Sequence, residues 1–322
     1  MKKSFIILVN IMAILVVFNA IEHKIYNDST KDFYERITER KPNKFEYLTK
    51  PLYGLKLENF FVGGNNEFGG RAPEGLEYNS TPITIFGCSY AFGQFLPPEA
   101  TFSYKLAHLL KRPVYNRAIP SKGLAKMLYQ SESDSFYNDV PPSDTVIYIM
   151  LNDHYRRMKL SFIEISDAYM HITYKKKGDK LIREDFNSPI KCFLNSTYLN
   201  KYIKKHWAHH YMNNPKFADK ITDEVLLYFI ETRKNLEARW NTKVNFVVIF
   251  YDSWLFHQDL LKEKLEKNNF KVIKMQELTN ENLYTDKYYS PQTLHPTETT
   301  WNLLTPKIVD YLKLNKENIN NK

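Results

Sequence analysis

The sequence predicts an α/β domain in which a parallel sheet is covered by helices on both faces. From residue 81 onward, short apolar runs alternate with stretches whose apolar residues recur at helical spacing. The chain has 322 residues, of which 43% are hydrophobic and 15% aromatic. This length and composition suit one such domain with a packed core and exclude a disordered chain.

Five apolar runs are the candidate strands: residues 83–86, 114–115, 146–150, 244–250 and 272–273. Helical patterns lie between and after them: residues 104–111, residues 124–130, a helix that Thr222 could cap, one marked by Phe256, Leu260, Leu261 and Leu265, and a terminal helix with Trp301, Leu304, Ile308 and Leu312. Residues 155–220 fit this alternation least well, so we predict that they form an insertion.

The first 21 residues have the pattern of an export signal. Lys2 and Lys3 precede an apolar run over residues 5–18. The run is shorter than the roughly 20 residues that a spanning helix needs, and Phe18-Asn19-Ala20 is a poor cleavage site. A removed signal peptide and an uncleaved signal anchor both stay open, with the anchor favoured. The remaining chain is expected to be secreted or held at the membrane on its extracytoplasmic (periplasmic or cell-surface) side. Residues 22–80 would form a stalk and a lead-in that packs on the main domain.

The charge and the cysteine count limit the kinds of partner and metal site that the protein could have. Lys and Arg outnumber Asp and Glu by 45 to 36, a net charge of +9 that is spread over several segments. Such a surface can meet an anionic membrane or an acidic glycan, and no motif supports nucleic acid as a partner. The two cysteines, Cys88 and Cys192, exclude a disulfide framework and a Cys-rich zinc site. His206, His209 and His210 have metal-ligand spacing but are interpreted as the basic aromatic face of a surface helix, so no metal or other cofactor is predicted.

The first of four short blocks follows the first predicted strand as Gly87-Cys88-Ser89. Gly87 allows a tight turn, which would project Ser89 from the strand end into a crevice. A serine hydroxyl becomes a nucleophile when a neighbouring base takes its proton. Taken alone, this block is also compatible with an ordinary strand-to-helix turn.

The other three blocks lie at comparable positions. Residues 115–123 follow the second strand and could present a backbone N–H to a developing oxyanion. Asn152 follows the third strand and could supply a side-chain amide donor. His295 precedes the terminal helix, with Pro296 suited to the first helical position. A loop-mounted histidine there could face the same crevice.

Together and in this order, the four blocks resemble the SGNH hydrolases, also called the GDSL esterase/lipase family, over roughly residues 80 to 315. The resemblance implies a flavodoxin-like three-layer α/β/α sandwich with five parallel strands over residues 81–315. It also implies Ser89 as nucleophile and oxyanion donor, Asn152 as a second oxyanion donor, and His295 as general base.

The sequence departs from the family at three positions. Cys88 replaces the family's Asp, and Ser121 stands where the family has an oxyanion Gly, with Gly123 nearby. The third departure is Gln292, three residues before His295, where the family usually has Asp. Exchanging the orienting carboxylate of a serine protease for an amide costs about 10⁴ in turnover.

With Gln292 in place of the carboxylate, several hypotheses for His295 stay open. Gln292 could still accept one hydrogen bond from His295, or Asp286 or a backbone carbonyl could hold the imidazole. A Ser–His dyad, which we favour, could operate without a carboxylate. Alternatively, activity could be lost.

The predicted function is serine-dependent hydrolysis of O-acyl groups, in particular O-acetyl groups, on exported or cell-envelope glycans. O-acetyl transfer and lipase or thioesterase activity would use the same residues. A hypothesis from a different functional class is a membrane-tethered glycan-binding or assembly protein with a degenerate site. Gln292 is the best support for it.

Overall fold

A computed structural model of the chain describes residues 70–71, 73–120, 122–159, 173–184, 214–252 and 256–320. The predicted export signal, residues 22–69, Ser121, Cys192, the three histidines of residues 206–210 and most of the predicted insertion lie outside the described residues. In the part of the chain that is described, no helix combines the length and the apolar character needed to cross a membrane.

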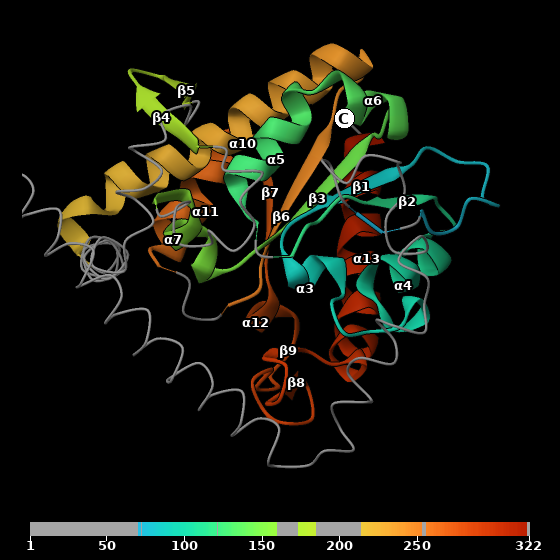
Figure 1. Cartoon of the computed structure of the whole chain (residues 1–322). Coiled ribbons are helices and arrows are strands. Elements are labelled where there is room, and N and C mark those ends of the chain that lie inside the picture. The colour runs from blue at the N-terminus through green and yellow to red at the C-terminus, as the bar shows by residue number, and fades with distance from the viewer. Residues whose placement is uncertain are drawn as a thin grey trace, which may run out of the picture.

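The central sheet has five parallel strands in the order β2-β1-β3-β6-β7 (Figure 1). Their bounds are β1 Ile83–Phe86, β2 Val114–Asn116, β3 Thr145–Met150, β6 Asn245–Phe250 and β7 Lys271–Lys274. Numbered within the sheet, the order is 2-1-3-4-5, the flavodoxin-like arrangement. The predicted fold class is therefore confirmed, and each predicted strand is present with its ends moved by at most one residue.

Helices cover both faces of this sheet. One face carries α3 (Ser89–Phe92), α4 (Phe102–Leu110), α12 (Met275–Leu278) and α13 (Glu298–Asn320). The other carries α5 (Leu124–Glu132), α6 (Asp134–Asp139), α7 (Asn152–Lys159), α10 (Ala218–Trp240) and α11 (Gln258–Lys267). Two short 3-10 helices, Pro98–Ala100 and Pro215–Phe217, and a hairpin of β4 (Thr173–Lys177) and β5 (Lys180–Glu184) complete these layers.

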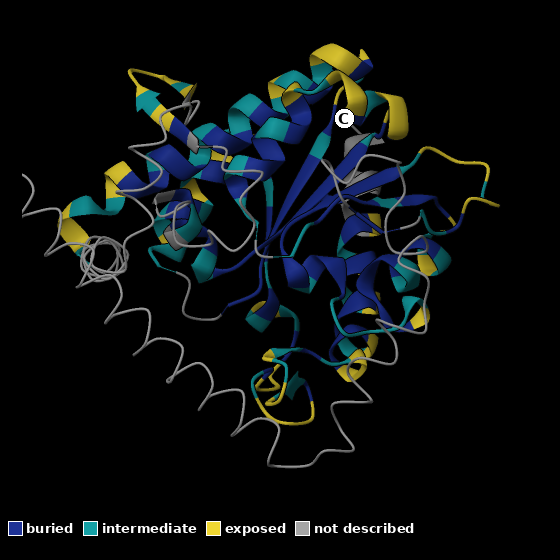
Figure 2. Ribbon diagram, in the orientation of Figure 1, coloured by how far each residue is buried: buried dark blue, intermediate teal, exposed yellow. Residues whose placement is uncertain are grey.

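The strands are apolar on both sides because each side faces a core. Along β3, Val146, Tyr148 and Met150 belong to the core under α10, whereas Ile147 and Ile149 belong to the core under α13. Successive side chains of a strand point to opposite faces. All residues of β1 and β3 and most residues of the other strands are accordingly buried (Figure 2), which explains the continuous apolar runs in the sequence.

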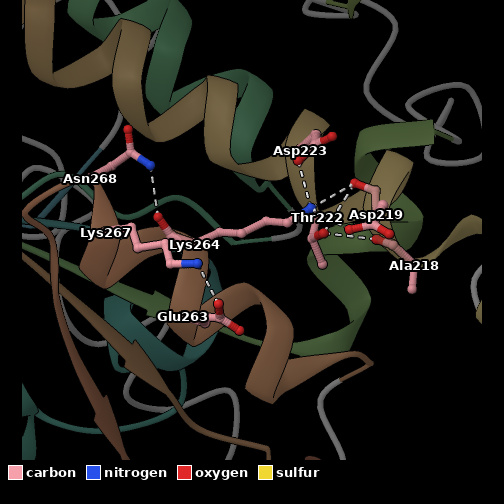
Figure 3. Close-up of polar contacts among 8 residues, drawn as sticks. All are labelled: Ala218, Asp219, Thr222, Asp223, Glu263, Lys264, Lys267 and Asn268. Carbon is pink, nitrogen blue, oxygen red and sulfur yellow. Dashed lines mark hydrogen bonds and ion pairs between the residues drawn. The ribbon is translucent and has the colours of Figure 1, made fainter.

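Two residues that were predicted to start helices do not do so. Thr222 lies one turn inside α10 and donates from its Oγ to the Ala218 carbonyl at 2.8 Å (Figure 3), so it does not cap the helix. A 3-10 helix capped by the side chain of Asn214 precedes α10 and moves its start back. Pro296 is part of the short strand β9 (His295–Pro296), and α13 begins two residues later, at Glu298.

Residues 70–80 pack on the edge of the sheet. Glu74 forms an antiparallel bridge with Val114 of β2, and the Arg71 amide donates to the Asn116 carbonyl at 2.9 Å. The buried Arg71 guanidinium donates to the carbonyls of Phe92, Gly93 and Leu96 at 3.2, 3.1 and 3.2 Å. This segment thus holds the turn that follows α3.

Candidate active site

Ser89 is the first residue of α3, directly after the turn that ends β1. Gly87 has φ +149°, and a Cβ placed there would lie 2.7 Å from Cβ of Ala91. The helix stops after one turn at Gly93, where φ is +75° and a Cβ would lie 2.6 Å from Cγ2 of Thr101. Both glycines are therefore required by the turn that places Ser89 at the carboxyl end of β1.

Asn152 begins α7 at the carboxyl end of β3, the strand next to β1. Its Oδ1 accepts from the Phe256 amide at 2.7 Å, and this bond fixes the orientation of the side-chain amide. Its backbone N–H donates to Oδ2 of Asp252 at 2.6 Å, and the Tyr284 hydroxyl donates to the other oxygen of that carboxylate. Asp252 follows β6, so a third strand end takes part in holding Asn152. Burial raises the pKa of Asp252.

The loop between β2 and α5 packs against both of these positions. The Ile119 amide donates to the Gly87 carbonyl at 3.1 Å, and Arg157 of α7 donates to the Lys122 carbonyl at 2.8 Å. A Cβ on Gly123 would lie 3.6 Å from the ring of His154. The predicted oxyanion residue of this loop, Ser121, lies outside the described residues.

His154 is a fully buried histidine two residues after Asn152. Its Nδ1 pairs with the Tyr148 hydroxyl at 2.8 Å. Burial and, secondarily, the nearby Arg157 charge lower its pKa from 6.5 to about 3, so the ring is neutral at ordinary pH. It supports the chain behind Asn152 and was not singled out from the sequence.

His295 lies on a hairpin made by β8 (Tyr289–Ser290) and β9. Its Nδ1 is 2.5 Å from the Thr293 carbonyl oxygen, which can only accept, so Nδ1 carries the proton. The other ring nitrogen, Nε2, is then an unprotonated acceptor, and it is buried without a hydrogen-bond partner. Burial lowers the pKa of His295, the bond to Thr293 opposes this shift, and the charge of Arg157 adds to it.

The structure gives Nδ1 a partner other than the two side chains considered from the sequence. Gln292 is exposed, and its Oε1 accepts from Oγ of Ser290 at 3.2 Å. Asp286 is also exposed. The backbone carbonyl of Thr293 accepts from Nδ1 instead, because the tight hairpin turns this carbonyl back onto the imidazole.

Aromatic residues join the Ser89 helix to the His295 hairpin. The Tyr90 ring lies 5.2 Å from the His295 ring, centroid to centroid, and the Phe95 ring lies 5.0 Å from it. The Tyr90 hydroxyl is 3.0 Å from the Leu294 carbonyl oxygen and 2.8 Å from the Tyr289 hydroxyl. Because a carbonyl only accepts, Tyr90 donates to Leu294 and Tyr289 donates to Tyr90.

Ser89, Asn152 and His295 thus lie at the carboxyl end of the sheet, where α3, α12 and the β8–β9 hairpin gather (Figure 1). Between the two described residues Ser89 and His295 there is no hydrogen bond, since Nε2 has no partner. Such bonds are often open in sites without substrate and close when it binds. No group of three or more metal-ligating side chains occurs among the described residues.

The sequence reasoning missed Arg71, Tyr90, Asp252 and His154. Tyr90 adjoins Ser89 in the sequence, and an aromatic residue beside a candidate nucleophile was the one available signal. Arg71 and Asp252 meet the site through contacts with residues 21 to 100 positions away. No short motif marks such contacts.

No protein-family model matches this chain, and no curated protein matches it significantly. Solved structures with a similar fold include a member of the lipolytic protein G-D-S-L family from Veillonella parvula DSM 2008, with 11% identity and a TM-score of 0.42, covering 72% of this chain and 97% of that one. The lipase Lip_vut3 from a goat rumen metagenome has 11% identity and a TM-score of 0.45, with coverage of 72% and 97%. A putative lipolytic G-D-S-L protein from Desulfitobacterium hafniense DCB-2 has 12% identity and a TM-score of 0.40, with coverage of 71% and 98%.

The three are described as a lipolytic protein, a lipase and a putative lipolytic protein. Two of the three are described as members of the G-D-S-L family, the family that the four sequence blocks resemble.

Proposed function

We propose that the chain is a serine-dependent ester hydrolase of the SGNH type, with Ser89 as nucleophile and His295 as general base. The observation that carries the proposal is the state of His295. Its Nδ1 proton is bound by the Thr293 carbonyl, and its Nε2 is an unpaired acceptor buried beside the Ser89 helix. A general base needs this combination of a fixed tautomer and an available lone pair.

The reaction proceeds in two steps. Nε2 of His295 takes the proton of Ser89 as Oγ bonds to the acyl carbon, and the same proton then passes to the alkoxide as the bond from the acyl carbon to the alcohol oxygen breaks. Water, activated by the same nitrogen, hydrolyses the acyl-enzyme and releases the carboxylic acid. The Ser89 amide, the Asn152 side chain and the Ser121 amide are the proposed oxyanion donors.

The substrates that we propose are O-acyl groups, above all O-acetyl groups, on exported or cell-envelope glycans. The export pattern of residues 1–21, which would act as an anchor or a cleaved signal, and the basic surface support this choice. O-acetyl transfer would use the same acyl-enzyme with a sugar hydroxyl in place of water. Lipase or thioesterase activity would need only a different acyl or leaving group.

A second candidate is a glycan-binding or assembly protein with an inactive site. It is favoured by the absence of a hydrogen bond between Ser89 and His295 and by the lack of a carboxylate on Nδ1. Covalent labelling with a fluorophosphonate separates the two functions.

A fluorophosphonate probe tests the nucleophile directly. Wild type should label covalently, Ser89→Ala should not, and His295→Gln should label far more slowly. Ser135→Ala is the matched control, because Ser135 is an exposed serine on α6, before β3 and thus at the opposite end of the strands. Labelling of Ser89→Ala at the wild-type rate would reject Ser89. A folded wild type that does not label would favour the binding function.

A further inference from the structure

Six non-glycine residues in the described part of the chain have positive φ, and two of them flank His295. Lys111 and Asn241 are the left-handed residues that end α4 and α10, and Asn269 and His257 adjoin the ends of α11. Phe95, with φ +69°, and Leu294, with φ +56°, have no such helix-end role. A bulky residue in this region is strained, and retained strain clusters at functional sites.

The surrounding structure holds Leu294 in its strained conformation from both sides. Its carbonyl accepts from Tyr90 at 3.0 Å, and its amide donates to the Ser290 carbonyl at 2.8 Å. Its side chain is nevertheless 55% exposed, so core packing does not account for a leucine at a position where glycine or asparagine would be unstrained.

Phe95 provides an apolar surface beside the imidazole of His295, the residue that follows Leu294. Its ring meets the His295 ring edge-on, at 5.0 Å between centroids and 77° between planes, and the side chain is half-buried. Phe95 lies in the loop after α3 and Leu294 in the β8–β9 hairpin. The two come to His295 from separate segments of the chain.

The reaction chemistry says which part of an ester would meet these side chains. The base returns its proton to the departing oxygen, so the alcohol moiety lies on the His295 side of the acyl carbon. We propose that Leu294 and Phe95 form an apolar subsite for the alcohol moiety, selecting alcohols with an extended C–H surface. This inference rests on the proposed function. Both the face of a sugar ring and an alkyl chain have this chemistry.

Steady-state kinetics with three acetate esters test the subsite, because the acyl group stays constant while the alcohol changes. Ethyl acetate offers almost no alcohol surface, hexyl acetate offers an alkyl chain, and a per-O-acetylated methyl glucoside offers a sugar face. Leu294→Asn should lower kcat/KM for one or both larger esters about fivefold relative to ethyl acetate. The larger ester whose kcat/KM falls relative to that of ethyl acetate identifies the kind of alcohol that the subsite binds.

Two variants make this comparison specific. Leu294→Met keeps an apolar side chain and should keep the wild-type preference. Lys111→Asn makes the same kind of change at a left-handed position far from the site and should leave the preference unchanged. Because asparagine tolerates this backbone region, the Tm of both Asn variants should equal or exceed that of wild type.

Three results would overturn the inference. If Leu294→Asn is active and its ester preference is unchanged, the subsite is excluded, whereas the proposed function is not contradicted. An equal loss on all three esters makes Leu294 a positioning residue for His295 instead. A wild type that hydrolyses none of the three esters and does not label with fluorophosphonate overturns the proposed function, and the subsite with it.

Discussion

At the scale of single residues, His295 shows how a backbone atom can take the place of a side chain. The Thr293 carbonyl fixes the same tautomer that a carboxylate would fix, but it has no full negative charge. In the proposed reaction, the imidazolium is therefore less stabilised than in a triad with Asp. Burial and Arg157 also lower the pKa of His295, which keeps its Nε2 unprotonated but makes it a weaker base.

A carboxylate introduced at Gln292 should not restore a triad. Gln292 is exposed and bonded to Ser290, and the Nδ1 proton of His295 is already bound by Thr293. We expect Gln292→Asp to change kcat/KM by less than about threefold. Asp286→Asn is the matched control at an exposed position and should also leave activity unchanged. A tenfold gain in Gln292→Asp would show that the new carboxylate displaces the carbonyl.

At the scale of elements, the hydroxyl of Tyr90 hydrogen-bonds α3 to the β8–β9 hairpin. The Tyr90 hydroxyl connects the residue after Ser89 to the residue before His295. Tyr90→Phe removes this bond and keeps the ring contact. Misplacing a catalytic group slows the chemical step, so we expect kcat to fall about tenfold with little change in KM.

The control for this variant is Tyr78→Phe. It also loses a bonded hydroxyl, one that pairs with Nδ1 of His108 at 2.7 Å, but far from the Ser89 turn. Its kinetics should match those of wild type. Equal kcat in Tyr90→Phe and Tyr78→Phe would mean that the tyrosine bond does not position His295.

The lead-in segment holds α3 through Arg71. Arg71→Met keeps the aliphatic stem but leaves the carbonyls of Phe92, Gly93 and Leu96 without this donor. Hydrogen bonds from a charged donor contribute more than neutral ones, so the loss of these three should lower the free energy of unfolding by about 2 kcal/mol or more in urea denaturation.

A lysine paired with two solvent-exposed carboxylates provides the comparison. Lys264 of α11 pairs with Asp219 and Asp223 of α10 at 2.9 and 2.6 Å (Figure 3), and both carboxylates face solvent. Lys264→Met should cost no more than about 1 kcal/mol. If Arg71→Met costs no more than Lys264→Met, the Arg71 contacts do not hold the turn as described.

At the scale of the whole molecule, local patterns predicted the elements and missed the contacts between them. The apolar runs predicted all five strands because each strand is buried on both faces, and the Ser89 turn followed from Gly87 and Gly93. Tyr90 and Leu294 are 204 positions apart, so the sequence around neither residue predicts the hydrogen bond between them. The predicted start of α10 was wrong because Thr222 has the chemistry of a cap, but its hydroxyl donates back to the Ala218 carbonyl.

Acid should destabilise the fold partly through His154. Its pKa is about 3 in the folded protein against the 6.5 of an ordinary histidine, so between these pH values the unfolded chain binds more protons. The stabilising contribution of neutral His154 is complete above pH 6.5 and is lost progressively as the pH falls toward 3. Arg157 and Asp153, the charges nearest to it, act in opposite directions on this pKa.

The buried carboxyl of Asp252 shifts the other way, so the test is a difference between variants. His154→Gln can still accept from Tyr148 but does not titrate. Between about pH 7 and about pH 4, wild type should lose more unfolding free energy in urea than His154→Gln loses. Parallel losses in the two proteins would contradict the assignment of this acid sensitivity to His154.

The bridge between Glu74 and Val114 also affects whether the protein associates with other copies of itself. An edge strand offers unpaired N–H and C=O groups to any other strand. Here the Glu74 amide donates to Val114 at 3.0 Å and the Val114 amide donates back at 2.9 Å, so the chain caps the β2 side of its own sheet. A shortened protein that began at β1 would keep Ser89, Asn152 and His295 but expose this edge to self-association.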